Sequence, residues 1–174
     1  LEVAEALLAA GLLPAIYFIF SRAGCDQAAR IVASAGLRLT SADEREVIRS
    51  FVAKAVAHLD PVDLGVLGHE SWLSTLESGV AAHHAGMVPA FKEAVEELFA
   101  DGYIKLVFAT ETLALGINMP AKAVVLESFS KFNGESHELL KPGDYTQLTG
   151  RAGRRGIDER GTAVILYSSY VPFK

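Results

Sequence analysis

The stretch Ile104-Lys-Leu-Val-Phe-Ala109 decides the fold of this 174-residue chain. A short apolar run of this kind is typical of a strand that is covered on both faces of a parallel sheet. Four more runs have the same character, and helix-length segments lie between the five. The sequence therefore predicts an α/β fold with a doubly wound, mainly parallel sheet, right-handed crossovers and helices on both faces. The four further runs are residues 15–20, 79–83, 123–127 and 162–167.

The expected helices are marked by their caps and by the spacing of their apolar residues. Ser41 followed by Glu44 has the pattern of a capping box, which opens an amphipathic helix. This helix is expected to run to about residue 59 and to stop at Asp60 and Pro61. The other expected helices cover residues 1–13, 25–35 and 88–100, with a short one around Trp72.

Composition limits the functions that this chain can have. Its formal charge of −5 argues against a protein that coats nucleic acid through net charge, so any nucleic-acid contact must be local. Cys25 is the single cysteine, which excludes an internal disulfide and a cysteine-rich zinc site and favours a reducing, cytoplasmic setting. Its place at the start of an expected helix favours a lowered thiol pKa. No apolar run is long enough to cross a membrane, and the chain opens on Leu1 without a secretory signal, as expected of a piece of a longer protein.

Polar residues that directly follow the expected strands mark the edge at which a ligand would bind. In doubly wound sheets, ligands lie beyond the carboxyl ends of the strands. Adjacent histidines of an extended chain point to opposite sides, so His83 and His84 are not expected to share a metal ion. The simplest interpretation is that one of them is buried and the other exposed. The residues at this edge are Ser21, Arg22, His83, His84 and Thr110.

The segment Tyr145-Thr-Gln-Leu-Thr-Gly-Arg-Ala-Gly-Arg-Arg-Gly156 carries the most functional information. If it is helical, Gln147, Arg151, Arg154 and Arg155 lie on one face. Guanidinium groups gathered in this way repel one another unless an anion meets them. A phosphoryl group is the anion that such groups bind best, because a planar guanidinium can donate two hydrogen bonds to it.

Two glycines within this segment support an anion site over a simpler alternative. Glycine inside a helix costs about 1 kcal/mol relative to alanine. Gly150 and Gly153 therefore suggest that something approaches the backbone closely. The alternative is a solvated basic end of a helix, where arginines are common because of the helix dipole.

The pattern Gln147-x-x-Gly-Arg-x-Gly-Arg-Arg-Gly resembles motif VI of superfamily 2 helicases, in the form found in the superkiller-type DExH branch. Three further motifs resemble those of the same branch, in the same order along the chain. Residues 107–121 resemble motif V, residues 79–90 resemble the nucleic-acid contact that follows motif IV, and residues 18–22 resemble motif IV. The resemblance covers nearly the whole chain and is greatest to bacterial HelY-type members. It implies that the sheet belongs to the second RecA-like domain of such a helicase.

The resemblance implies a nucleotide site that two domains share. The chain contains neither a Gly-x-x-x-x-Gly-Lys-[Ser/Thr] phosphate loop nor an Asp-Glu-x-His or Asp-Glu-Ala-Asp tetrad. ATP and Mg²⁺ would therefore be held mainly by a first RecA-like domain that precedes this one, and the isolated chain is expected to be inactive. Arg151 and Arg154 would reach that ATP as arginine fingers and stabilise transition-state charge. The other residues expected to face the nucleotide are Gly116, Asn118, Gln147 and Arg155.

The resemblance also implies a track of single-stranded RNA or DNA. Contacts mainly to the nucleic-acid backbone would give little sequence preference. Taken alone, Thr110 has a simpler role as the cap of the short helix that follows it. The residues expected to touch the track are Ser21, Arg22, His84, Gly86, Thr110 and Glu111.

Residues 1–174 are expected to form one helicase C-terminal domain, with a helical insertion at about residues 40–78. Such insertions are familiar in the superkiller-type branch, whose members continue into accessory domains beyond this one. The competing hypothesis is a non-catalytic α/β module that binds a nucleotide or an acidic partner through its arginine face. A complete phosphate loop or a dinucleotide fingerprint would mark such a module, and the chain has neither. RNA versus DNA, the direction of movement and the role of residues 60–70 stay open.

Overall fold

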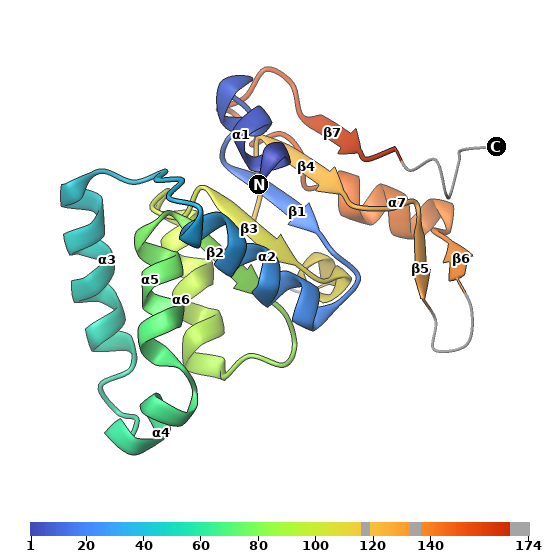
Figure 1. The fold of residues 1–174 in the computed structure, drawn as a ribbon. Coiled ribbons are helices and arrows are strands. Elements are labelled where there is room, and N and C mark those ends of the chain that lie inside the picture. Colours follow the sequence, from blue (N-terminus) through green and yellow to red (C-terminus); the bar gives the residue numbers. More distant parts are fainter. Residues whose placement is uncertain (116–118, 133–136, 168–174) are drawn as a thin grey trace.

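The computed structural model describes residues 1–115, 119–132 and 137–167, and its centre is a five-stranded parallel sheet (Figure 1). The strands lie in the order β2-β3-β1-β4-β7, and every neighbouring pair is parallel. The predicted doubly wound sheet is therefore confirmed. The strands are β1 (Ala15–Phe18), β2 (Val80–His83), β3 (Leu106–Ala109), β4 (Ala123–Leu126) and β7 (Thr162–Ile165).

Helices cover both faces of this sheet (Figure 1). Helices α1 (Glu2–Ala9) and α2 (Arg22–Ser34) pack on one face. Helices α5 (His69–Glu77), α6 (Pro89–Ala100) and α7 (Pro142–Thr149) pack on the other. Helix α3 (Ala42–Ala55) packs on α5 and α6, and the short α4 (Pro61–Val66) contacts α5. Within the described residues, no helix is long and apolar enough to cross a membrane.

Alternate residues of each strand supply two separate cores. In β1, Ile16 and Phe18 join the core beneath α5 and α6, whereas Ala15 and Tyr17 belong to the core beneath α1 and α2. Successive side chains of a strand point to opposite faces, so a strand covered on both sides is apolar throughout. The polar groups of the sheet are consequently confined to the ends of its strands.

Helix α3 begins as predicted but ends earlier. Ser41 Oγ accepts a hydrogen bond from the Glu44 amide at 3.1 Å, and the Glu44 carboxylate accepts one from the Ser41 amide at 2.7 Å, which confirms the capping box. The helix ends at Ala55 instead of near residue 59. Asp60 starts a new helix, because its carboxylate accepts a hydrogen bond from the Val62 amide at 2.7 Å and so caps α4.

A two-stranded antiparallel sheet beside α7 was not expected from the sequence. Strand β5 (Ser130–Phe132) pairs with β6 (His137–Leu139) (Figure 1). Each strand has three residues, which is too short for an alternating pattern to stand out.

Cys25 lies in the core between α2 and the sheet and is fully buried. Burial, together with a smaller effect of the nearby charge of Asp26, raises the pKa of its thiol to about 12. The expected lowering of this pKa by the helix dipole is therefore wrong. Helix α2 begins three residues before Cys25, at Arg22, so Cys25 lies within the first turn on the buried face of the helix. The cost of desolvating a thiolate there outweighs the favourable effect of the helix dipole.

Candidate functional site

The carboxyl ends of three neighbouring strands, β2, β3 and β1, bring the predicted nucleic-acid contacts to one edge of the sheet. The register places His83 of β2 and Phe18 of β1 level with Ala109 of β3. The Thr110 amide donates a hydrogen bond to the His83 carbonyl at 3.2 Å. The loops that follow these strands, which carry Ser21, His84 and Thr110, therefore start side by side.

The two adjacent histidines point to opposite faces of the sheet, as predicted. His83 Nε2 lies 2.8 Å from Glu96 Oε1 on α6, and His84 Nε2 lies 3.1 Å from Asp26 Oδ1 on α2. Both histidines are buried, so the expectation that one of them is exposed is wrong. The reason is that helices cover both faces at this edge and each offers a carboxylate to the imidazole beneath it.

Each ring nitrogen of His84 has its own hydrogen-bond partner. The Gly86 amide donates a hydrogen bond to His84 Nδ1 at 3.2 Å, so Nδ1 carries a lone pair and Nε2 carries the proton that is donated to Asp26. A side chain at residue 86 would come within 3.3 Å of His84 Nδ1, which explains the glycine. The imidazole therefore shapes the loop of residues 84–86, and both of its nitrogens are occupied within the domain.

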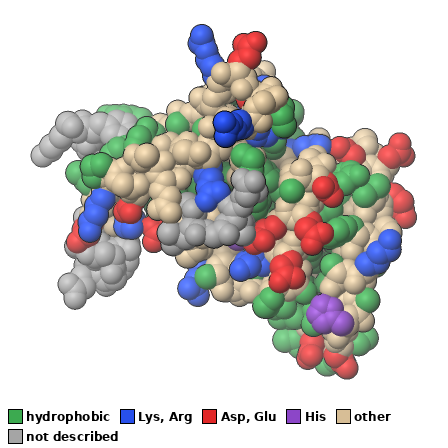
Figure 2. All heavy atoms as spheres, turned by 180° about the vertical axis from the view of Figure 1, so that it is seen from behind, with side chains coloured by type: hydrophobic (Ala, Val, Ile, Leu, Met, Phe, Trp, Pro, Cys, Tyr) green, Lys and Arg blue, Asp and Glu red, His purple; other side chains and the backbone are tan. Residues whose placement is uncertain are grey.

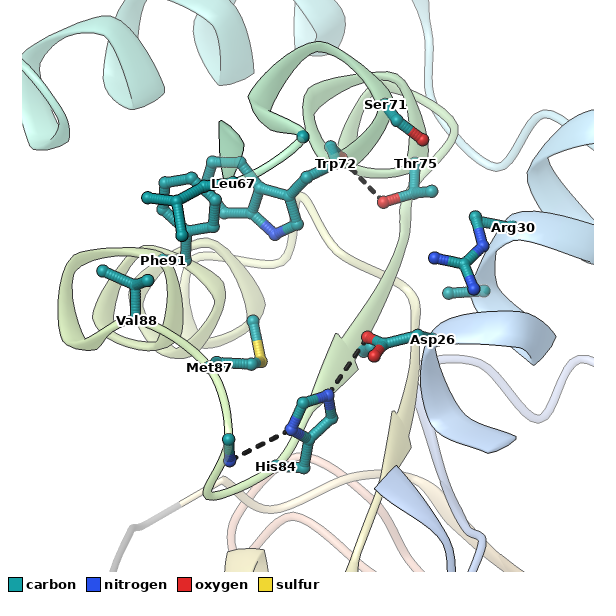
Figure 3. A pocket seen from close by; sticks show the side chains of 14 residues that line it. Asp26, Arg30, Leu67, Ser71, Trp72, Thr75, His84, Met87, Val88 and Phe91 are labelled. Atoms are coloured by element: carbon teal, nitrogen blue, oxygen red, sulfur yellow. Dashed lines mark hydrogen bonds and ion pairs between the residues drawn. The ribbon is translucent and has the colours of Figure 1, made fainter. Parts of the chain in front are cut away.

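His84 and Asp26 also line a cavity of about 270 Å³ between α2, α5 and the start of α6 (Figure 3). Its opposite wall is aromatic, because the rings of Trp72 and Phe91 stack with centroids 3.9 Å apart. Trp72 Nε1 is buried and has no hydrogen-bond partner among the described residues. The cavity is therefore mixed in character, with a carboxylate and an imidazole facing an aromatic pair.

Ser21 and Arg22 occupy the start of α2 at the same edge. Ser21 Oγ caps the helix by accepting a hydrogen bond from the Gly24 amide at 3.1 Å. Arg22 is exposed, and its Cδ lies 3.5 Å from the position that a Cβ of Gly86 would take. The structure thus brings Arg22 next to the 84–86 loop, as a nucleic-acid contact formed by both would require.

Thr110 and Glu111 begin the short helix η1 (Glu111–Leu115) that follows β3. The Thr110 hydroxyl lies 2.9 Å from the Thr112 hydroxyl, and the Thr110 carbonyl accepts a hydrogen bond from the Leu113 amide. Glu111 is engaged in an ion pair at 3.0 Å with Lys131 of β5.

Lys131 joins the start of η1 to the start of α7. Its ammonium group lies 3.0 Å from the Glu111 carboxylate and 3.2 Å from the Asp144 carboxylate of α7. These two carboxylates raise the pKa of Lys131, Glu111 first. The charged bridge fixes one end of α7 against the segment that leaves β3.

The arginine segment is a loop and not the helix that the spacing argument assumed. Helix α7 ends at Thr149, and only Gln147 of the four predicted side chains lies within it. Ala152 pairs with Ala121, just before β4: the Ala121 amide donates to the Arg151 carbonyl at 3.0 Å, and the Gly153 amide donates to the Ala121 carbonyl at 2.7 Å. The arginine loop, residues 150–161, therefore lies at the amino ends of β4 and β7, away from the edge that carries Thr110.

The glycines of the arginine loop allow two stretches of backbone to cross. Gly153 has a φ of +92°, and a Cβ on it would lie 3.1 Å from the backbone of Gly161. A Cβ on Gly161 would overlap the Ala152 carbonyl group. The close approach that the sequence indicated is thus an approach of the chain to itself.

Arg154 is held by Asp158 through three hydrogen bonds. Its Nε and Nη2 donate to the two carboxylate oxygens at 2.8 Å each, and its backbone amide donates to Oδ2 at 2.9 Å. The same guanidinium lowers the pKa of Asp158 to about 2, and Asp158 raises the pKa of Arg154. The pair stays ionised at any ordinary pH.

The other residues expected to face the nucleotide differ in their exposure to solvent. Gln147 and Arg155 are exposed, and Arg151 is half-buried. Gly116 and Asn118 lie outside the described residues. In the parts of the chain that the structure describes, no group of three or more His, Cys, Asp or Glu side chains is arranged to hold a metal ion.

Sequence reasoning missed Asp26, Glu96, Lys131 and Asp158 as members of the site. Asp158 had a local signal, because it follows Arg154 by four residues in a glycine-rich loop. The other three contact their partners only through the tertiary fold, and nothing in the local sequence marks them.

Acidic side chains are unevenly spread over the surface. In the view of Figure 2, they gather over the half of the molecule that α3 to α6 form. The arginine loop has the opposite character, since residues 150–161 contain four arginines and two acidic residues. A polyanion would consequently be repelled by the helical half and attracted to restricted sites elsewhere.

A parallel sheet with this strand order, with helices on both faces, defines the chain as a RecA-like α/β domain. The model of the helicase conserved C-terminal domain matches residues 62–156. The probable helicase HelY of Mycobacterium tuberculosis is 59% identical over 166 residues, which cover 95% of this chain and 18% of that protein.

Two eukaryotic relatives are similar over nearly the same range. The DExH-box ATP-dependent RNA helicase DExH11 of Arabidopsis thaliana is 45% identical over 161 residues, which cover 92% of this chain and 12% of that protein. Superkiller complex protein 2 of Homo sapiens is 44% identical over 162 residues, which cover 92% and 13%. The chain belongs to the helicase conserved C-terminal domain family, and its relatives are superkiller-type helicases, as the motifs predicted. It spans less than a fifth of the length of these three relatives.

Proposed function

We propose that this chain is the second motor domain of an ATP-dependent nucleic-acid helicase and that it supplies arginine fingers to ATP held by another domain. The observation that carries the proposal is the arginine loop. It is anchored at the sheet through Ala121 and Ala152, and Asp158 holds one of its guanidinium groups in a single orientation. A fixed guanidinium on a locally basic loop suits the recognition of a phosphoryl group whose charge grows during transfer.

In this proposal the nucleotide is shared between domains. The chain has no phosphate loop, and its described residues contain no carboxylate cluster for Mg²⁺, so ATP and Mg²⁺ would be held mainly by a first RecA-like domain of the same polypeptide. Arg151 and Arg154 would meet the phosphates from the opposite side of the cleft. Gln147 and Arg155, at the end of α7 and in the loop, are the described residues next to them.

The nucleic acid would run along the carboxyl edge of the sheet. Arg22, the loop of residues 84–86 and Thr110 lie together there, and a backbone track would need such contacts without reading bases. Ser21 and His84 would support this edge, since the first caps α2 and the second holds the Gly86 amide. Glu111 would contribute to this edge mainly through its ion pair with Lys131. A direct contact with a phosphate is less favourable, because a carboxylate repels it.

Single-stranded RNA is the first track to test, because relatives with 45% and 43% identity bear the name RNA helicase. Single-stranded DNA is the alternative. The single buried cysteine suits a cytoplasmic protein.

The proposal is tested by Arg154→Ala in the full-length protein that contains this domain. We expect nucleic-acid-stimulated ATP turnover to fall by about a hundredfold or more, as for other arginine fingers, with ATP binding largely intact. Arg49→Ala is the matched control, because Arg49 is an arginine of α3 that forms its own ion pairs with Glu46 and Glu77. Turnover of the Arg154 variant close to that of the control would refute the proposal.

A further inference from the structure

Asp158 closes a short loop around Arg154 from both the backbone and the side chain. The Asp158 and Ile157 amides donate to the Arg154 carbonyl at 2.9 and 3.0 Å. In return the Asp158 carboxylate accepts from the Arg154 amide, Nε and Nη2. The Asp158 side chain is 6% exposed, whereas that of Arg154 is 27% exposed. The carboxylate is thus enclosed by the loop, and the guanidinium is the partner that reaches solvent.

In the part of the chain that the structure describes, the geometry leaves three of the five N–H donors of the guanidinium group free for a second anion. An arginine side chain has five N–H donors. Asp158 takes the Nε–H and one Nη2–H, so one Nη2–H and both Nη1–H groups remain, and these have no hydrogen-bond partner among the described residues. Because the guanidinium is planar, the occupied edge and the free edge lie in one plane and point in different directions. A phosphoryl oxygen can therefore bind to the free edge while Asp158 keeps the occupied one.

We propose that Asp158 is a positioning residue, which orients Arg154 so that its free edge meets the γ-phosphoryl group of ATP on the partner domain. This inference rests on the proposed function, in which Arg154 is an arginine finger. An unrestrained arginine has several rotamers, and fixing one before the reaction removes that entropic cost from the transition state. The carboxylate also offsets the repulsion between Arg154 and the neighbouring Arg155.

The test is Asp158→Asn in the full-length protein with saturating single-stranded nucleic acid. Asparagine keeps one acceptor oxygen but turns an NH₂ group towards the guanidinium, so one of the two side-chain hydrogen bonds and the ion pair are lost. We expect kcat for ATP hydrolysis to fall about tenfold with little change in KM for ATP or in Kd for the nucleic acid. Glu77→Gln is the matched control, since it removes an arginine–carboxylate pair on α3 and α5, away from the loop. The control should keep full turnover.

A double-mutant cycle separates positioning from a general structural role. If Asp158 acts through Arg154, then Arg154→Ala combined with Asp158→Asn has the same kcat as Arg154→Ala alone. Independent losses that multiply, or a KM and a nucleic-acid Kd that worsen together with kcat, would overturn the inference. Faster turnover in Asp158→Asn would also overturn it, because the carboxylate would then be a restraint that catalysis must release.

A second variant covers the case in which Asp158→Asn does not fold. Asp158→Glu keeps the charge and both oxygens but displaces the guanidinium by about one C–C bond, ~1.5 Å. A kcat reduced severalfold at unchanged KM supports positioning, and an unchanged kcat contradicts it. Normal turnover in Arg154→Ala would refute the proposed function itself, whereas an impaired Arg154→Ala beside normal Asp158 variants refutes only the present inference.

Discussion

His83 illustrates how a single buried polar atom makes stability depend on pH. Its Nε2 donates to Glu96, while its Nδ1 is buried without a hydrogen-bond partner among the described residues. Protonation would add an N–H at Nδ1 with nothing to accept it, and burial accordingly lowers the pKa of His83, against the opposing effect of Glu96. The contact with Glu96 is therefore a hydrogen bond from a neutral imidazole.

This lowered pKa predicts a loss of stability in mild acid. Below the ordinary histidine pKa of about 6.5, the unfolded chain binds a proton at this position more readily than the folded chain does. The contribution of His83 is thus fully present above about pH 6.5 and is lost as the pH falls towards its lower folded-state pKa. We expect the unfolding temperature to drop by a few degrees between pH 7.5 and 5.5, and to drop less in His83→Gln. Circular dichroism melts at both pH values check this.

Exposed His58 offers the control for that measurement. His58→Gln should keep the pH dependence of the unmodified protein, because it removes an exposed imidazole and leaves the His83–Glu96 contact in place. Equal slopes in the His83 and His58 variants would mean that other groups cause the acid sensitivity.

The arginine loop shows at the scale of an element why a correct motif predicted a wrong conformation. The spacing of Gln147, Arg151 and Arg154 fits a helical face, yet the helix stops at Thr149. Two backbone contacts decide this: Ala152 pairs with Ala121, about thirty residues earlier in the chain, and Gly161 lies against Gly153 at the other end of the loop. Local spacing holds no information about either contact, so the pattern could name candidate residues but could not give their geometry.

Close backbone crossing makes Gly161 the glycine least tolerant of substitution in the arginine loop. In Gly161→Ala the new Cβ would overlap the Ala152 carbonyl, and the backbone itself must shift. We expect the free energy of unfolding to fall by about 1–3 kcal/mol and ATP turnover of the full-length protein to fall with it. Chemical denaturation and turnover assays measure the two effects.

Gly143→Ala is the control, since Gly143 lies in α7 with no heavy atom within 4 Å of the new Cβ. This variant should be neutral or up to about 1 kcal/mol more stable. If Gly161→Ala were as stable as Gly143→Ala, the crossing would be looser than the structure has it.

The elements that sequence predicted well are those set by local chemistry. Apolar runs located all five strands of the parallel sheet, and Ser41 with Glu44 located the start of α3. The elements that it missed depend on contacts between distant segments, such as the β5–β6 pair and the Lys131 bridge to α7. For the candidate site, the rule that ligands lie at carboxyl ends led to Thr110 and His84, which stay predictions. The same rule could not lead to the arginine loop, because that loop lies at the opposite ends of the strands.

At the scale of the whole molecule, two segments connect the proposed nucleic-acid edge with the arginine loop. The first leaves β3 at Thr110 and reaches Ala121, which pairs with Ala152. The second is α7, tied near its start to Glu111 through Lys131 and leading into the arginine loop at its end. Because a helix of eight residues is about 12 Å long and rigid, a shift at one edge would be transmitted to the other. The proposed nucleic-acid contacts and the arginine loop thus lie at opposite edges of the sheet. This arrangement suits the proposed motor, in which nucleic-acid binding and ATP hydrolysis are coupled.

A nucleotide site shared between two domains predicts that residues 1–174 alone do not hydrolyse ATP. A guanidinium can stabilise the transition state only where ATP and Mg²⁺ are already held, and the chain has no phosphate loop to hold them. We expect phosphate release by the purified chain to equal that of buffer, with or without single-stranded RNA, and ATP to bind too weakly for titration calorimetry at micromolar protein. The full-length protein, assayed in parallel, should turn over ATP and respond to nucleic acid. If the chain alone hydrolysed ATP and Arg154→Ala abolished that activity, a complete nucleotide site would lie within these residues. That result would contradict the proposal that ATP is held by another domain.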